Sequence, residues 1–235
     1  MNHHSRFFNR CFTAIFAVSV FAGCNVAAQT SKPIIVALNK AENTLAIIDA
    51  PTMKVTAKVP TGDGPHEVVL SSDGRVAYVA NYGAQTPGNS ITVIDLPTAR
   101  ELRRVDISPL IRPHGLQMVG GKLYFTSETN RVIARYDPVA NKIDWLMGTG
   151  QNASHMIAVS ADQKKFYTAN IASDTITAFD FQNVPPSASR ITHIPVGKQP
   201  EAIDLSPDGK EVWTGLNADG MAEVVDTATA RSVAK

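Results

Sequence analysis

Short alternating runs of apolar and polar residues recur along this chain at a nearly constant interval. Each run has the period of two that is typical of a half-buried β-strand, and no segment shows a sustained helical period. The intervals between the ends of successive runs are 46, 42, 43 and 46 residues. The runs TLAIID, SITVID, VIARYD, TITAFD and MAEVVD end at Asp49, Asp95, Asp137, Asp180 and Asp226. A repeat of about 40–45 residues is typical of propeller blades built from four strands.

A second series of segments recurs in the same phase and predicts a hairpin in each repeat. Its members are GPHEVVLSSDGRVAYVAN, RPHGLQMVGGKLYFTS, ASHMIAVSADQKKFYTAN and QPEAIDLSPDGKEVWTG. Asp73-Gly74, Gly120-Gly121 and Asp208-Gly209 supply the backbone freedom that a tight turn needs. Together the two series predict an all-β propeller of four-stranded antiparallel blades. The recurring Asp residues are interpreted as turn formers, and Trp145 and Trp213 as packing between blades.

The predicted propeller domain covers residues 29–235, with about five blades present. The first blade, 33–59, begins at its second strand, and the chain stops within an outer strand. The remaining blades are predicted at 66–107, 114–147, 155–195 and 201–235. A Pro-rich stretch at 183–187 is interpreted as a long surface loop within the fourth blade. We therefore expect an incomplete ring from a chain truncated at its C-terminus.

Two of the hairpin segments carry a family resemblance. TGDGPHEVVLSSDGRVAYVANYG and VGKQPEAIDLSPDGKEVWTG resemble repeats of the bacterial YVTN β-propeller family, in which seven blades are usual. RPHGLQMVGGKLYFTSETNRVIARYDP also resembles repeats of virginiamycin B lyase and, less closely, of gluconolactonase-like propellers. The lyase resemblance implies a divalent cation and a histidine base, with His114 or His155 as candidates. The lactonase resemblance implies calcium, for which Glu128, Asn170 and Glu201 are the available donors.

The N-terminus predicts export. Residues 1–28 combine Arg6 and Arg10 with an apolar segment and small residues at 26–28, as in a secretory signal peptide. An alternative is a lipoprotein signal that ends at Cys24, which would then carry a lipid anchor. The predicted location is periplasmic or secreted, with membrane attachment only through that lipid. Cys11 and Cys24 both belong to this region, so no disulfide is expected in the propeller.

Composition and charge remove several classes of function. The chain is 44% hydrophobic and 18% charged, which is typical of a folded globular protein. Without the leader, 20 basic residues face 21 acidic residues, so nothing attracts nucleic acid electrostatically. The sequence contains no Ser-His-Asp elbow, phosphate loop, dinucleotide fingerprint or cysteine metal cluster.

Polar residues recur at two positions that an antiparallel blade places on one face. His66, His114, His155 and Glu201 open the innermost strands, and a second set closes the strands that follow them: Asn39, Asn81, Glu128, Asn170 and Asn217. The ligand-binding candidates are therefore His66, His114, His155, Glu201, Asn81, Glu128 and Asn170, at the mouth of the channel. The three histidines could hold a divalent metal, or each could cap its own blade through backbone hydrogen bonds.

These features predict an exported scaffold that binds a small molecule or a protein partner at the channel mouth. The alternative is a divalent-metal-dependent enzyme of the lyase or lactonase type at the same mouth, with His114 and His155 as the catalytic candidates.

Overall fold

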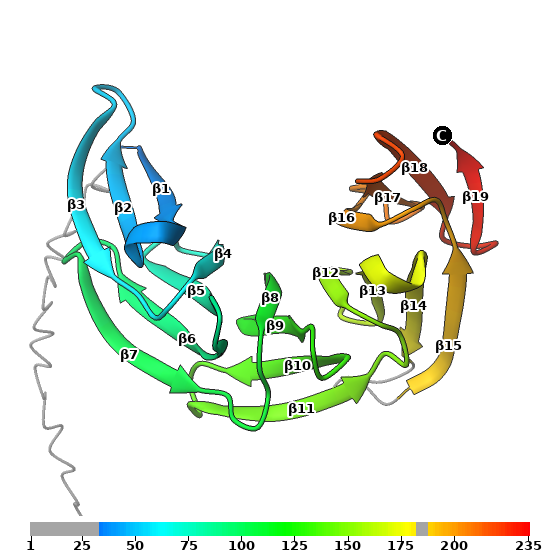
Figure 1. Cartoon of the computed structure of the whole chain (residues 1–235), viewed down its shortest axis with the longest axis horizontal. Coiled ribbons are helices and arrows are strands. Elements are labelled where there is room, and N and C mark those ends of the chain that lie inside the picture. The colour runs from blue at the N-terminus through cyan, green and yellow to red at the C-terminus, as the bar shows by residue number, and fades with distance from the viewer. Residues whose placement is uncertain (1–32, 182–187) are drawn as a thin grey trace, which may run out of the picture. The chain divides into compact units, whose positions relative to one another are not determined.

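Five antiparallel β-sheets follow one another along the chain, each built from strands that are consecutive in the sequence (Figure 1). The first sheet has three strands and each of the other four has four strands, so the predicted all-β propeller of about five blades is confirmed. The strands of blades 1 and 2 are β1 (Ile34–Asn39), β2 (Thr44–Asp49), β3 (Lys54–Pro60), β4 (Pro65–Leu70), β5 (Val76–Gly83), β6 (Pro87–Asp95) and β7 (Arg100–Asp106).

The remaining three blades repeat this order. Their strands are β8 (Pro113–Val119), β9 (Lys122–Ser127), β10 (Val132–Asp137), β11 (Lys142–Gly148), β12 (Ser154–Val159), β13 (Lys165–Asn170), β14 (Thr175–Phe181), β15 (Ala188–Pro195), β16 (Pro200–Leu205), β17 (Glu211–Leu216), β18 (Met221–Asp226) and β19 (Arg231–Ala234). Two short 3₁₀ turns, η1 (Lys40–Glu42) and η2 (Ile171–Ser173), follow β1 and β13. The innermost strands β4, β8, β12 and β16 come from four successive blades, and each contacts the next (Figure 1).

This computed structural model describes residues 33–181 and 188–235, which belong to one unit, Pro33–Lys235. The predicted leader at 1–28, the lipidation candidate Cys24 and the loop at 183–187 lie outside the described residues. Among the described residues, no helix is long and apolar enough to cross a membrane.

A serine and an aspartate close the hairpin between the first two strands of a blade. In blade 2 the Ser71 hydroxyl donates to the Asp73 carboxylate at 2.6 Å and accepts from the Val76 N–H at 2.9 Å. The same serine-to-aspartate bond recurs in blade 4 at 160–162 and in blade 5 at 206–208. Each turn therefore satisfies its polar groups locally, which explains why Ser-x-Asp recurs with the blade period.

The aspartates that end the third strands also form turns. Asp49, Asp95, Asp137 and Asp226 accept hydrogen bonds from backbone N–H groups two or three residues later, as predicted. Asp180 pairs with Arg190, at 3.4 Å between carboxylate and guanidinium, and the residues that follow Phe181 lie outside the described residues. The aspartates that end the third strands thus stabilise turns, and they do not belong to the innermost strands.

Aromatic rings fill the space between blades 3 and 4. Phe166 is fully buried, with its ring centroid 4.9 Å from those of Tyr124 and Phe181 and 5.8 Å from that of Trp145. The prediction that Trp145 packs between blades is confirmed. Trp213, in the last blade, is 48% exposed. It alternates with Val212, which packs toward blade 4, so its side chain lies on the opposite face of the sheet.

We expect Phe166→Ala to lower the free energy of unfolding by about 3–5 kcal/mol, because it removes a buried ring and leaves a cavity between two blades. Urea unfolding followed by the fluorescence of nearby Trp145 measures the change. Leu146→Ala is the matched control, because Leu146 is 56% exposed. Equal effects of the two substitutions would contradict the assignment of Phe166 to the core.

Candidate functional site

Each four-stranded blade carries a β-bulge at the start of its innermost strand. The pairing with the second strand shifts by one residue between Pro65 and Glu67, and the same shift recurs at 113–116, 154–157 and 200–203. The residues within these bulges include His66, His114, His155 and Glu201, the residues predicted to open the strands. A bulge turns a side chain out of the regular alternation. The four side chains therefore need not follow the alternation of the strands that carry them.

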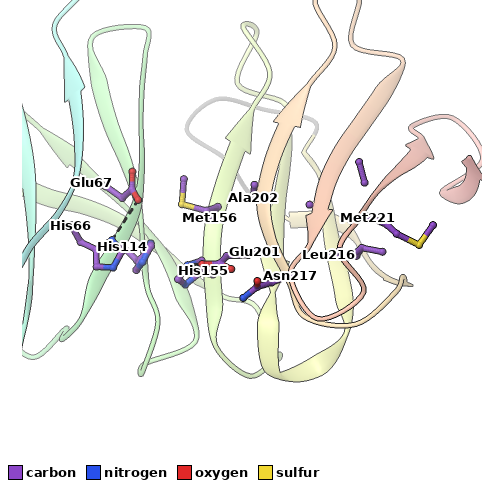
Figure 2. A pocket seen from close by; sticks show the side chains of 13 residues that line it. His66, Glu67, His114, His155, Met156, Glu201, Ala202, Leu216, Asn217 and Met221 are labelled. Carbon is purple, nitrogen blue, oxygen red and sulfur yellow. Dashed lines mark ion pairs between the residues drawn. The ribbon is translucent and has the colours of Figure 1, made fainter. Parts of the chain in front are cut away.

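The three histidines come together as a continuous row across three blades. The ring centroids of His66 and His114 lie 4.3 Å apart, and those of His114 and His155 lie 3.6 Å apart. His114 is 1% exposed and His155 is 9% exposed, whereas His66 is partly exposed. Figure 2 shows the three rings along the same side of the cavity. The sequence prediction that repeated histidines meet at the inner face thus agrees with their positions in the structure.

Blades 3 and 4 approach closely beneath this row. A Cβ atom at Gly115 would lie 2.7 Å from the His155 carbonyl oxygen and 2.7 Å from the Met156 Cα atom, closer than side-chain carbons come. The Thr126 hydroxyl accepts from the Gly115 N–H at 2.9 Å and donates to the His155 carbonyl at 2.5 Å. Glycine and threonine together therefore join the two inner strands at the residues that carry the rings.

Carboxylates border the row of rings at both ends. Glu128 Oε2 lies 3.4 Å from His155 Nδ1, and Glu201 Oε1 lies 3.7 Å from His155 Nε2. At the other end, Glu67 Oε1 lies 3.6 Å from His66 Nδ1. Burial raises the pKa of the Glu128 carboxyl, but the adjacent His155 and Tyr82 lower it by more, so its net pKa is lowered. Glu128 is therefore a carboxylate at neutral pH.

Unpaired polar atoms concentrate at the centre of the row. Among the described residues, five buried side-chain polar atoms lack a hydrogen-bond partner, and four of them belong to this cluster. They are His114 Nδ1, His114 Nε2, His155 Nδ1 and Glu128 Oε2; the fifth is Arg103 Nε. Burial, with the neighbouring histidines and Lys40, lowers the pKa of His114 to about 2. His114 is thus a neutral imidazole whose two nitrogens are both unsatisfied, and backbone capping does not account for it.

Tyr82 forms a wall behind the first two histidines. Its ring centroid lies 5.3 Å from those of His66 and His114, and the Arg112 guanidinium lies 4.5 Å above its ring. Burial and the nearby Glu128 carboxylate raise the pKa of Tyr82. Sequence reasoning missed both Tyr82 and Glu67. Each directly follows a predicted site residue, but neither type recurs with the blade period, which was the signal used.

The predicted amides do not gather with the histidines. Asn81 is 1% exposed; its carbonyl oxygen accepts from the Gly62 N–H at 3.1 Å, and its amide donates to the Ser90 and Thr92 hydroxyls. Asn170 is fully buried and bonds residues of its own blade, at 2.8 Å from Ser154 Oγ to its carbonyl oxygen. Asn39 bonds Thr44 in blade 1, and of the strand-end amides Asn217 lines the cavity. The side chains of Asn81 and Asn170 therefore form hydrogen bonds that stabilise the blades.

A cavity of about 560 Å³ opens along the inner strands of blades 2 to 5. One end is polar and the other is apolar, as Figure 2 shows by the separation of His66 and Glu67 from Leu216 and Met221. The polar residues are His66, Glu67, His114, His155, Glu201 and Asn217; the others are Met156, Ala202, Gly215, Leu216, Gly220, Met221 and Ala222. A ligand with a polar head and an apolar body fits such a cavity.

Two compact donor sets among the described residues could hold a metal ion. They are His66, Glu67 and His114, and His114, Glu128 and His155, with ligand atoms within 4.8 Å of one another in each set. The predicted trio of His66, His114 and His155 is not one of these sets. In each set the third ligand residue is a glutamate next to the rings, Glu67 in the first set and Glu128 in the second.

Comparison with known proteins identifies a family and a shared fold. A family model described as YNCE-like β-propeller matches residues 10–183. The comparison with curated proteins found no match.

Three solved structures illustrate the shared fold. A candidate 6-phosphogluconolactonase from Bacteroides uniformis is 16% identical with a TM-score of 0.71, over 88% of this chain and 68% of that one. Hydrazine synthase of Kuenenia stuttgartiensis is 15% identical with a TM-score of 0.57, over 82% and 73%. A dihydro-heme d1 dehydrogenase is 15% identical with a TM-score of 0.63, over 86% and 43%. At these identities the likeness concerns the fold alone.

We expect Gly115→Ala to destabilise the protein by about 1–3 kcal/mol, because the added methyl group overlaps the backbone of blade 4 and must push the two inner strands apart. Urea unfolding measures the loss. Gly148→Ala is the control, because a Cβ there meets no atom within 4 Å. A Gly115→Ala protein as stable as the control would show that the close approach is not required.

Proposed function

The chain belongs to the YNCE-like β-propeller family, and from this premise we propose that it is a scaffold that binds a small ligand at the inner face of blades 2 to 5. The observation that carries the proposal is the cavity of about 560 Å³ whose polar end contains the histidine row. A volume of this size suits a small organic molecule. The buried, unpaired atoms of His114 and Glu128 at that end offer polar groups whose partners the protein does not itself supply.

The charge of the cavity favours a cationic or hydrogen-bond-donating ligand head. Its lining contains Glu67 and Glu201, and no Lys or Arg occurs among the described residues that line it. His114 contributes no positive charge, because its pKa is held at about 2. The apolar body of the ligand would lie against Leu216 and Met221.

The proposed place of action is the periplasm or the exterior of the cell. Support for export comes from the signal-peptide pattern at 1–28, with a lipid anchor at Cys24 as the alternative form. The finer assignment to the YVTN group rests on the two segments that resemble its repeats. We propose no role for nucleic acid, because the charge balance without the leader offers it no attraction.

The second candidate function is a divalent-metal-dependent lyase or lactonase-type enzyme, favoured by the grouping of imidazoles and carboxylates at one end of the cavity. Two observations weigh against acid–base chemistry of those types. A histidine with a pKa of about 2, such as His114, is a weak base at neutral pH. The oxygen donors suited to calcium are also not assembled, because Asn170 is buried within blade 4. Binding is therefore the function that the geometry supports best.

Phenethylamine and 3-phenylpropionate test the proposed function, because they share an aromatic body and carry opposite charges. With protein freed of metal by EDTA, we expect the amine to bind more tightly than the acid in calorimetric titrations. Glu201→Gln is expected to weaken binding of the amine by about 1.5–5-fold, the effect of losing one partly exposed charge pair.

Glu101→Gln on β7 is the matched control, because Glu101 pairs with Arg104 on the outer strand and does not line the cavity. Absence of amine binding, or equal affinity for both compounds, would show that the acidic cavity is not the ligand site.

A further inference from the structure

We infer that His114, Glu128 and His155 bind a first-row divalent transition-metal ion at the polar end of the cavity. This inference goes beyond the proposed function, because a metal ion at this end of the cavity would compete with a cationic ligand head for the same place. The three residues come from β8, the turn directly after β9, and β12, so the site would join blade 3 to blade 4. No single blade contains all three donors.

The unpaired atoms are the first argument for the ion. A buried imidazole or carboxylate atom without a partner is energetically costly, so native proteins rarely leave one unsatisfied. Here both nitrogens of His114, Nδ1 of His155 and Oε2 of Glu128 are unsatisfied and adjacent. One metal ion would satisfy a nitrogen of His114 together with the atoms of His155 and Glu128. Crowding alone does not explain why the unpaired atoms should be ligand atoms of two histidines and a carboxylate.

The spacing of the donors is the second argument. His155 Nδ1 and Glu128 Oε2 lie 3.4 Å apart. Two ligand atoms bound to one tetrahedral ion at zinc-like bond lengths lie roughly 3.3–3.4 Å apart. All three donors lie within 4.8 Å of one another, so closing the set requires only small side-chain adjustments. The observed pair therefore already has the separation of two ligands of a common ion.

The chemistry of the donors selects the class of metal. Two imidazoles and one carboxylate suit Zn²⁺, Cu²⁺, Ni²⁺ or Co²⁺, whereas Mg²⁺ and Ca²⁺ require mainly oxygen ligands. The cavity that His114 and His155 line gives access to the fourth coordination position.

Glu201 would act as a positioning residue for His155. When Nδ1 of a histidine binds a metal, its Nε2–H commonly donates to a carboxylate that fixes the orientation of the ring. Glu201 Oε1 lies 3.7 Å from His155 Nε2, on the side of the ring away from Glu128. The neighbouring set of His66, Glu67 and His114 is less suited, because His66 and Glu67 are each 32% exposed in their side chains and already contact each other at 3.6 Å.

Titration with Co²⁺ and Zn²⁺ alone tests the inference, using the full chain without a histidine tag and without organic ligand. We expect one equivalent of Co²⁺ to give the visible absorption of a four-coordinate ion, and Zn²⁺ to displace it. His155→Gln and Glu128→Gln are each expected to abolish this spectrum. Glu201→Gln is expected to weaken Co²⁺ binding by about 10–100-fold without changing the stoichiometry, as outer-sphere substitutions do.

His193→Gln is the matched control, because His193 lies on β15 and contacts Thr177, outside the cavity. The inference is overturned if the wild-type chain binds no stoichiometric Co²⁺, a result that needs no folded variant. It is also overturned if the spectrum persists in both His155→Gln and Glu128→Gln, or if His66→Gln abolishes it while Glu128→Gln does not. Loss of metal binding with phenethylamine binding intact would overturn the metal site alone and leave the proposed function standing.

Discussion

The histidine row depends on the close approach of blades 3 and 4. The absence of a side chain at Gly115 lets one inner strand contact the backbone of the next, and the Thr126 hydroxyl joins the Gly115 N–H to the His155 carbonyl. The ring centroids of His114 and His155 are then 3.6 Å apart. Stacked β-sheets normally lie about 10 Å apart, so such proximity arises only at the narrow inner edge, where successive blades converge. The aromatic cluster around Phe166 fills the wider space farther out.

Proximity and burial together determine the electrostatic character of the site. If His114 and His155 were both protonated, their positive charges would repel each other strongly, because the buried surroundings screen charge poorly. Burial therefore favours a neutral ring at His114. Burial first, and then the neighbouring His155 and His66, lower the pKa of His114. A neutral His114 ring beside the Glu128 carboxylate makes the inner face a place for a cation, whether a metal ion or the head of a ligand. Both ring nitrogens of His114 are buried, and a buried polar atom without a partner is costly.

The fold itself does not select a function. The solved structures that share it carry the names of a candidate lactonase, a hydrazine synthase and a heme dehydrogenase, at identities of 15–16%. A propeller presents a variable set of side chains at the inner edge of a constant frame, and different chemistries can be placed there. In this chain the inner strands carry bulges that contain His66, His114, His155 and Glu201. These features, and not the blade count, should be compared when function is inferred among relatives.

The sequence by itself determined the strand order, the hairpin turns and the blade period, because these depend on interactions between residues close in the chain. Alternation of apolar residues and the local bonds of Ser71 with Asp73 are examples. The repeated phase also predicted that three histidines would share one face. Only the tertiary structure decided which polar residues meet. Asn81 stands at a position that carries Asn in other blades, but its side chain forms hydrogen bonds that hold the fold together. Tyr82 and Glu67 contact His66 at the site, although neither residue type recurs with the blade period. The reason is physical: a one-residue bulge redirects a side chain, and the distance between blades depends on packing that no local pattern encodes.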